Sequence, residues 1–482
     1  MTPSLTTKPQ DLAAAAGSPS ALSVRWALAG LALATALSSL GASIAHVALP
    51  TLMQVFAVNF STVQWVVLAY LLASTALIVG AGRLGDMLGR RRLLLAGIGL
   101  FVAGSLGGGL APTLGWVIAA RALQGLGAAI MLALSMALVG DIASSGRTGA
   151  AIGLLGTMSA LGTALGPSLG GLLLSGFGWR SLFLVNVPLG LLAAGLLQRH
   201  LSADRPISPS ARKAFDGTGT LLLALTLASY ALAVTWGRGS WSMRNLSLLL
   251  TALAAAGLFV FVVQRTAAPL IPLATFRDRR LRASLAMNAL VATVMMTTLV
   301  VGPFYLARTV GLSPFGVGLA LSVGPVVAAL TGVPAGRLTD RWGSGYLIAV
   351  GLAAMAAGCG LLLVLPTALG LPGYLGPIIL ITAGYGFFQT ANNTAVMTGV
   401  SPERRGVVSG LLNLSRNFGL ITGASVMGAV FAWVAGTAEF ATASPEAVAG
   451  SMRVTFGAAG LLILVALALR SADLSSVQFG AQ

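Results

Sequence analysis

Residues 82–92, GRLGDMLGRRR, form a short charged segment between two long apolar stretches of the chain. A second segment, GRLTDRWG at residues 336–343, repeats it between two other apolar stretches. Glycine, arginine, leucine, aspartate and glycine recur in both segments at the same spacing. A charged turn that occurs once in each half of a chain indicates a duplicated membrane protein whose halves share one design. The repeat therefore predicts a transporter.

The amino-acid composition places the chain in a membrane. Of its 482 residues, 56% are hydrophobic and only 8% are charged, whereas soluble domains carry roughly a quarter charged residues. The net charge of +17 comes from basic residues at the ends of apolar segments, without a basic patch interleaved with aromatic side chains. We therefore expect the lipid bilayer and a small-molecule substrate as partners, no nucleic acid, and a monomeric protein.

The chain contains fourteen apolar segments of about 20 residues, the length that crosses a bilayer as a helix. The first segment is too long for the core of a signal peptide and is predicted to remain as a span. The predicted spans are 26–49, 63–82, 93–111, 115–140, 148–173, 178–198, 217–236, 246–264, 284–305, 315–335, 345–365, 373–399, 406–434 and 452–470.

Basic residues alternate between successive loops. Loops such as 83–92 and 265–282 carry several arginines each, while 50–62 and 112–114 carry none. Loops rich in lysine and arginine remain on the cytoplasmic side of a membrane. With an even number of spans, this pattern places both termini in the cytoplasm and predicts a multi-pass protein of the cell (inner or plasma) membrane.

Two polar segments flank the seventh and eighth spans and are interpreted as linkers. Removing the helix pair between them leaves six spans on each side, which matches the repeat of the charged turn. The fold class is therefore all-α and integral to the membrane, with two six-helix bundles and two inserted helices. The predicted organisation is a flexible cytoplasmic tail at 1–25, an N-terminal bundle at 26–198, a cytoplasmic linker at 199–216, the inserted pair at 217–264, a second cytoplasmic linker at 265–283, a C-terminal bundle at 284–470 and a cytoplasmic tail at 471–482.

Three motifs on successive predicted spans carry a family resemblance. They are the turn at 82–92 after the second span, RALQGLG at 121–127 in the fourth span, and GTALGPSLGG at 162–171 in the fifth. With these motifs the chain resembles the major facilitator superfamily, specifically its fourteen-helix drug–proton antiporter branch of multidrug efflux permeases. The resemblance implies proton-coupled efflux of small amphipathic or drug-like compounds by alternating access. It also implies a proton gradient as the energy source and no cofactor.

The charged turns are interpreted as a gate on the cytoplasmic side. Asp86 can lie at the N-terminus of the helix that begins near Arg405, where the helix dipole favours a negative charge, and Asp141 can pair with Arg90. Such contacts would hold the two halves together until one rocks against the other; arginines that only enforce topology are the alternative. The first and last glycines of the turn are expected to permit close backbone approach. The predicted gate residues are Gly82, Arg83, Asp86, Gly89, Arg90, Asp141, Gly336, Asp340 and Gly343.

The fifth-span motif places a glycine at every fourth position, which predicts a flat ridge for close helix packing. A proline within the motif interrupts the backbone hydrogen bonds and can bend the helix. The resemblance identifies this motif as an antiporter element, and helix packing alone is the simpler interpretation. The predicted motif residues are Gly162, Gly166, Pro167, Gly170 and Gly171.

Few ionisable side chains fall inside the predicted spans, and such side chains are costly in lipid and usually functional. They are Arg121, Arg416 and His46, and no acidic residue lies in the middle of a span. Against the family pattern, Gly41 stands where an aspartate is usual, so the expected acidic partner of Arg121 is missing. Arg121 is then satisfied by backbone carbonyls and Gln124, or it binds an anionic group of the substrate.

His46 shares a helical face with Ser39 and Ser43, a polar stripe that suits a cavity better than lipid. The unperturbed pKa of histidine lies near physiological pH, so proton coupling is predicted to depend on His46 or on Arg121 itself. A histidine that only forms hydrogen bonds near the membrane interface is the alternative.

The twelfth span carries three amides, Gln389, Asn392 and Asn393. Amides are unfavourable in lipid, so one face of this helix is expected to line a polar cavity or to contact another helix. Substrate binding and helix–helix hydrogen bonding are both open. Asn288, in the ninth span, is interpreted as part of the packed core.

Several classes of enzyme site are excluded by the sequence. No nucleotide-binding P-loop and no His-Glu-x-x-His motif occurs, and no carboxylate pair lies within the membrane. We therefore expect no enzyme activity, no catalytic residues and no bound metal. Two alternatives to drug export remain: export or import of an anionic or neutral metabolite, and, in a different class, a channel or a non-transporting membrane sensor.

Overall fold

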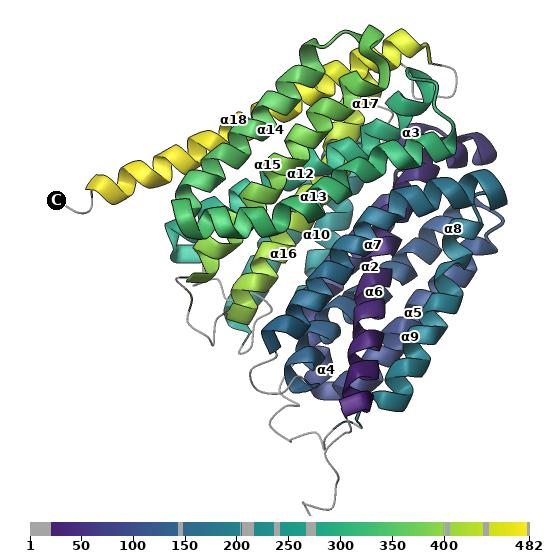
Figure 1. Ribbon diagram of the computed structural model, residues 1–482, viewed down its shortest axis with the longest axis vertical. Helices are drawn as coiled ribbons and strands as arrows, with labels where there is room; N and C mark the ends of the chain where they lie inside the picture. Colours follow the sequence, from purple (N-terminus) through teal and green to yellow (C-terminus); the bar gives the residue numbers. More distant parts are fainter. Residues whose placement is uncertain are drawn as a thin grey trace, which may run out of the picture.

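The computed structural model describes residues 21–142, 148–202, 204, 216–235, 242–266, 276–398, 400, 405–436 and 443–479, and these residues are almost entirely helical (Figure 1). The helices of the first half are α2 (Ala21–Phe56), α3 (Phe60–Val63), α4 (Trp65–Leu88), α5 (Arg90–Gly109), α6 (Leu114–Ile142), α7 (Thr148–Phe177), α8 (Ser181–Leu184) and α9 (Asn186–His200). They are followed by the pair α10 (Gly217–Thr235) and α11 (Met243–Arg265). The helices of the second half are α12 (Arg279–Arg308), α13 (Pro314–Trp342), α14 (Ser344–Val364), the 3-10 turn η3 (Thr367–Leu369), α15 (Gly370–Thr398), α16 (Arg405–Thr422), the π-helical segment η5 (Gly423–Met427), α17 (Gly428–Val434) and α18 (Pro445–Phe479).

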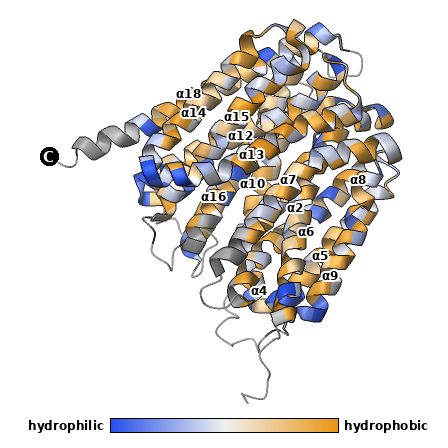
Figure 2. Cartoon of the chain, viewed as in Figure 1, coloured by the Kyte–Doolittle hydropathy of each residue, from blue (hydrophilic) through white to orange (hydrophobic). Residues whose placement is uncertain are grey.

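Within these described residues, fourteen helical segments are long and apolar enough to cross a membrane. Each overlaps one of the fourteen predicted spans, so the prediction of an all-helical membrane fold is confirmed. Figure 2 shows apolar residues along the lengths of the helices and hydrophilic residues gathered mainly near their ends. A chain that presents apolar side chains over most of its helical surface is solvated by lipid rather than by water.

The two charged turns have the same backbone geometry. Gly89 separates α4 from α5 with φ 96°, and Gly343 separates α13 from α14 with φ 83°. Each glycine closes the preceding helix with the same type of bond, from Gly89 N to Gly85 O and from Gly343 N to Thr339 O, both 2.9 Å. Side chains rarely adopt this positive φ, so both turns require glycine at their last position.

The two halves repeat the same helix pairings. In the first half α2 packs on α6, α7 and α9, and α5 packs on α6 and α9. In the second half α12 packs on α15, α16 and α18, and α14 packs on α15 and α18. The duplicated turn is thus part of a duplicated bundle, as expected for transporters built from internal repeats.

The inserted pair lies beside the junction of the two halves. Helix α10 packs on α11, on α4 of the first half, and on α16 and η5 of the second half. Tyr230 of α10 stacks on Phe418 with ring centroids 5.6 Å apart, and its hydroxyl is 3.2 Å from Thr422 Oγ1. Leucines such as Leu250 and Leu253 of α11 are more than half exposed, and they form part of its apolar outer surface.

We call the end of the molecule with the two charged turns the turn end, and the opposite end the far end. At the far end, the ring of Phe60 lies 4.9 Å from that of Phe304 and 5.8 Å from that of Phe431. Gln64 of the loop before α4 packs against Gly428 of α17. These contacts join the first half to the second and close the far end.

Helices α7 and α13 are in close backbone contact across the two halves. A Cβ atom placed on Gly318 would lie 2.9 Å from Cα of Gly171, so neither position has room for a side chain. Nearer the turn end of α13, Gly332 and Gly336 face open space. Figure 1 shows the helices of the two halves diverging toward the turn end. The halves are therefore held together mainly at the far end.

This packing predicts opposite effects for the same substitution at two positions of α13. We expect Gly318→Ala to lower the free energy of unfolding by about 1–3 kcal/mol because it overpacks the α7 contact. We expect Gly332→Ala to be neutral or stabilising by up to about 1 kcal/mol, because alanine favours a helix and meets no neighbour there. Thermal unfolding of the purified protein in detergent measures both, and equal transition temperatures for the two variants would contradict the proposed contact.

Candidate functional site

Arg121 of α6 is buried, with 1% of its surface exposed, and it is held by groups from three helices. Its Nε donates to the carbonyl oxygen of Val66 at 2.8 Å, and its Nη1 donates to that of Gly41 at 2.8 Å. Nη1 also donates to Oε1 of Gln124 at 3.0 Å, and the guanidinium lies 4.3 Å from the ring centroid of Tyr70. Backbone carbonyls and Gln124 therefore satisfy most of the arginine in place of an acidic side chain.

The position expected to hold an acid is tightly packed. A Cβ atom placed on Gly41 would lie 3.0 Å from the ring of Phe101 on α5, which fills the space beside the helix. The polar network continues instead through Gln124, whose Nε2 donates to Ser105 Oγ at 2.7 Å. Ser105 in turn donates to the carbonyl oxygen of Phe101 at 2.7 Å. Thus α2, α4, α5 and α6 are joined around one buried cation.

Two buried nitrogen atoms near this network have no hydrogen-bond partner. They are Nη2 of Arg121 and Nδ1 of His46 on α2. His46 is only 3% exposed, and the charge of Arg121 acts on it electrostatically. Leaving a buried polar atom without a hydrogen-bond partner costs about 1–3 kcal/mol of stability. These two atoms are therefore suited to form a hydrogen bond with a substrate group or water, or to take part in proton transfer.

The other members of the predicted polar stripe, Ser39 and Ser43, do not face a cavity. The hydroxyl of Ser39 lies 2.7 Å from that of Ser159 on α7, and Ser43 Oγ donates to the backbone of α2 and to the carbonyl oxygen of Gly162. Our expectation of a cavity face was wrong for these two serines, because the packed ridge of α7 covers them.

The glycine ridge of α7 packs as its spacing predicts. Gly162 lies against the backbone of Ala36, and Gly166 and Gly170 lie against Ser43 and Ile44, all on α2. Gly171, on an adjacent face, meets the start of α13 in the other half. Pro167 lies within the continuous helix. Helix α7 is therefore in close contact with both halves at once.

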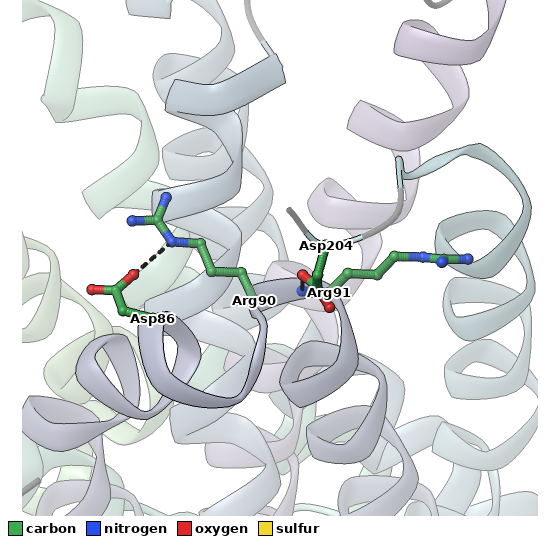
Figure 3. Close-up of polar contacts among 4 residues, drawn as sticks. All are labelled: Asp86, Arg90, Arg91 and Asp204. Atoms are coloured by element: carbon green, nitrogen blue, oxygen red, sulfur yellow. Dashed lines mark hydrogen bonds and ion pairs between the residues drawn. The ribbon is translucent and has the colours of Figure 1, made fainter. Parts of the chain in front are cut away.

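The turn between α4 and α5 holds five of the predicted gate residues, and Figure 3 shows two of them, Asp86 and Arg90. Asp86, near the end of α4, accepts a hydrogen bond at 2.9 Å from Nε of Arg90, the first residue of α5, with the two side chains 48% and 35% exposed. The side chain of Asp141, predicted to pair with Arg90, lies outside the described residues. So do the side chains at Arg405 and its neighbours, where Asp86 was expected to bind.

The glycines of the turn differ from one another. We expected Gly82 to approach another backbone, but it faces open space, as does its counterpart Gly336. That expectation was wrong for this conformation, in which the halves diverge at the turn end. Gly85, between the predicted gate residues, packs against Leu134 of α6 instead. Asp340 of the second turn is exposed.

Asp204 is a gate-region residue that the sequence analysis missed. It follows α9, and one carboxylate oxygen accepts a hydrogen bond from the backbone N–H of Arg91 at 2.8 Å (Figure 3). The other accepts from the backbone N–H of Arg92 at 3.1 Å. Asp204 lies against Gly89 and caps the N-terminus of α5, where a negative charge is stabilised by the helix dipole. Arg91 also donates to the carbonyl oxygen of Gln198 on α9. The only signal in the sequence is an acidic residue among the arginines of the first linker.

The amides of the second half are incompletely hydrogen bonded; Asn288 and Asn392 are buried, and Gln389 and Asn393 are half-buried. Nε2 of Gln389 is 3.5 Å from Oδ1 of Asn393, the limit of a hydrogen bond, and Oε1 of Gln389 has no partner. Asn392 is fully buried and neither of its amide atoms has a partner. Asn288 donates to the carbonyl oxygen of Leu412 at 2.8 Å, which joins α12 to α16 as core packing predicts, while its Oδ1 has no partner.

Neither a metal site nor a nucleophile elbow is found among the described residues. Histidine, cysteine and acidic side chains do not gather there in groups of three or more that could hold a metal. Residues 166–170 match the G-x-S-x-G pattern of a nucleophile elbow, but they lie inside the continuous helix α7 rather than at a strand-to-helix turn. The buried polar side chains described above lie within the helices that are long and apolar enough to cross a membrane.

Comparisons with known proteins agree with this arrangement. The family model of the Major Facilitator Superfamily matches residues 31–424. Multidrug resistance protein Stp of Mycobacterium tuberculosis is 34% identical over 404 residues, covering 83% of this chain and 74% of Stp. Drug efflux pump JefA of the same organism is 33% identical, covering 81% and 77% of the two chains. Riboflavin transporter RibZ of Clostridioides difficile is 29% identical, covering 82% and 86%.

Solved structures share the fold at low sequence identity. A bacterial homologue of the human lysosomal transporter Spinster, in an inward-facing and unoccupied conformation, superposes with a TM-score of 0.65 at 17% identity, covering 94% of this chain and 97% of that one. A mutant of nucleoside transporter NupG superposes with a TM-score of 0.66 at 14% identity, covering 92% and 99%. The family match, the duplicated bundle and the fourteen apolar helices lead to one conclusion: the chain belongs to the Major Facilitator Superfamily and is a multi-pass membrane transporter, not an enzyme.

Proposed function

We propose that this transporter exports small amphipathic, drug-like compounds across the cell membrane in exchange for protons, by alternating access. The observation that carries the proposal is the packing of α7. Its antiporter motif contacts α2 through Gly166 and Gly170 and contacts α13 of the other half through Gly171. A helix that packs closely on both halves is suited to act as the joint about which they rock. The names of the relatives Stp and JefA support drug export.

The arginine-rich turn end is proposed to face the cytoplasm, with both termini on that side. The closed far end then faces outward, and the diverging turn end is accessible from the cytoplasm. This is the state in which an exporter takes up its substrate. The protein is proposed to work as a monomer without a cofactor, driven by the proton gradient.

A second candidate is the export or import of an anionic or neutral metabolite. It is favoured by the absence of acidic side chains from the middle of the spans, since a carboxylate is the usual partner of a cationic compound in a membrane. The relative named as a riboflavin transporter belongs to the same family.

Counterflow in proteoliposomes tests the proposed transport directly. Vesicles loaded with an unlabelled compound should transiently accumulate the labelled compound, because a carrier exchanges the two across the membrane. A panel of cationic, neutral and anionic compounds identifies the substrate, and an imposed pH gradient then tests proton coupling. A channel would equilibrate the label without overshoot, and a sensor would not move it.

The proposed gate predicts that Asp86→Asn impairs transport while membrane insertion remains normal, because the arginines that set topology are unchanged. The exposed Asp86–Arg90 pair is itself worth only about 0.2–1 kcal/mol. In the proposed gate, Asp86 also binds the N-terminus of the helix that begins near Arg405 when the turn end closes. We therefore expect Asp86→Asn to reduce the transport rate more than Arg90→Gln does. Initial rates of counterflow with surface expression as the control measure this, and a wild-type rate in Asp86→Asn would reject the gate.

The cap on α5 predicts a separate effect at the same turn. Asp204→Ala leaves two N–H groups without acceptors, so we expect the free energy of unfolding to fall by about 1–2 kcal/mol. Asp204→Asn retains one acceptor oxygen without the charge and should lose less. Thermal unfolding ranks the three proteins. If both variants unfold at the wild-type temperature, Asp204 does not stabilise the turn.

Proton coupling is proposed to depend on His46 or Arg121. An arginine does not release its own proton, but its charge can favour the neutral form of His46 until the helices move. We expect His46→Gln to keep counterflow and to lose the response to a pH gradient, and Arg121→Ala to lose the response as well. Transport in proteoliposomes with and without the gradient measures both. Full gradient dependence in both variants would discard the idea.

A further inference from the structure

The spans contain the cationic side chains of Arg121 and Arg416 but no acidic side chain away from a helix end. The chain has 11 acidic residues, and within the fourteen spans only Glu446 occurs, in the first turn of α18. Arg121 lies well inside α6, and Arg416 lies near the middle of the helical run from α16 to α17. A charge in the membrane requires compensation. Because Arg121 is compensated mainly by carbonyl dipoles and an amide, the interior keeps a positive electrostatic character.

Arg416 lies near the side of α16 that packs on α12 and α15. Ser415 donates to the carbonyl oxygen of Leu285, so this side of α16 faces α12. Phe418 and Thr422 meet Tyr230, so a second side faces α10. Arg416 lies one helical turn from Leu412, which packs with Leu285 of α12 and Val396 of α15. Its Nε is buried and has no hydrogen-bond partner.

Unpartnered amides lie on the two helices that pack beside Arg416. Val396 of α15 packs with Leu285 of α12 and Leu412 of α16 in one apolar cluster. Asn392 lies one helical turn from Val396, and Asn288 lies one turn from Leu285, both toward the middle of the membrane. The unpartnered buried atoms on α12, α15 and α16 are Oδ1 of Asn288, Oε1 of Gln389, both amide atoms of Asn392 and Nε of Arg416.

We propose that Arg416 and these amides form a subsite for the acidic group of an organic anion, such as a carboxylate or a sulfonate. Guanidinium groups bind such planar or trigonal oxygen groups through charge-assisted hydrogen bonds. Nδ2 of Asn392 supplies a further donor. The amide oxygens of Asn288, Gln389 and Asn392 accept hydrogen bonds from hydroxyl or N–H groups beside the acid. This inference rests on the proposed function and specifies its substrate class, because a cation meets no counter-charge in the spans.

Charge balance gives the proposal a consequence of its own. When one monovalent anion leaves the cell and one proton enters, the equivalent of two positive charges moves inward. An inside-negative membrane potential therefore drives the exchange. A monovalent cation leaving in exchange for one proton moves no net charge.

The test is counterflow without a pH gradient, in proteoliposomes that contain the full-length protein. The probes are 5-carboxyfluorescein and rhodamine 123, which share a xanthene skeleton but differ in charge, with 1-naphthalenesulfonate as a second anion. We expect exchange of at least one anion and none of rhodamine 123. Arg416→Gln should raise the half-saturating anion concentration about tenfold or more, as loss of a charge-assisted hydrogen bond does, with a smaller change in the maximal rate.

Two variants control for loss of packing. Arg416→Lys keeps the charge and should recover part of the affinity. Arg453→Gln makes the same change as Arg416→Gln in α18 of the same half, where Arg453 donates to the carbonyl oxygen of Leu365 near the far end. It should leave the half-saturating anion concentration within about twofold of wild type, because removing an uninvolved surface contact has a small effect.

Several results would overturn the proposal. One is counterflow of rhodamine 123 without counterflow of either anion. Another is that neither anion shows counterflow at all. The third is a half-saturating anion concentration in Arg416→Gln that equals the wild-type value. Anion exchange that fails to respond to an imposed pH gradient supports the anion subsite and contradicts the proton coupling of the proposed function. The two proposals can therefore fail separately.

Discussion

A guanidinium group inside a membrane must be hydrogen bonded, and the first half of this protein is arranged around that requirement. Water is excluded from the hydrocarbon region, so Arg121 takes its partners from the protein. Arg121 donates to the carbonyl oxygens of Gly41 and Val66, which lie within helices α2 and α4. Carbonyl oxygens at such positions normally accept hydrogen bonds only from N–H groups of their own helix. By sharing them, the arginine ties α2 and α4 to α6, and Gln124 extends the tie to α5. The relative positions of these four helices follow from one buried cation.

The fold could be predicted from the sequence because two independent patterns agree. The apolar stretches give the number of spans, and the repeated turn gives the duplication. The ends of the helices were harder to place. Helix α2 continues beyond the predicted span to Phe56, through Pro50. Hydropathy marks only the part of a helix that meets lipid, whereas backbone hydrogen bonding lets the helix continue into the polar region.

The site could be predicted where the hydrogen-bonding requirement of a single side chain decides its surroundings. The missing acid at Gly41 led to backbone carbonyls and Gln124 as partners for Arg121, and this is the arrangement found. Other features depend on which elements meet in space. The ring of Phe101 beside Gly41 and the cap supplied by Asp204 come from distant segments. The periodicity that places Ser39 and Ser43 on one face does not say which helix covers that face.

The inserted pair makes the two sides of the molecule unequal toward the bilayer. Two seams run between the halves, one along α4 and α16 and the other along α7 and α13. Helix α10 packs across the first seam, while no inserted helix packs on α7 or α13 among the described residues, and these two helices carry exposed apolar side chains such as Leu165 and Leu330. An amphipathic compound dissolved in the membrane therefore meets one seam screened by an extra helix and one bordered directly by lipid. Lateral entry, where it occurs, has a preferred side.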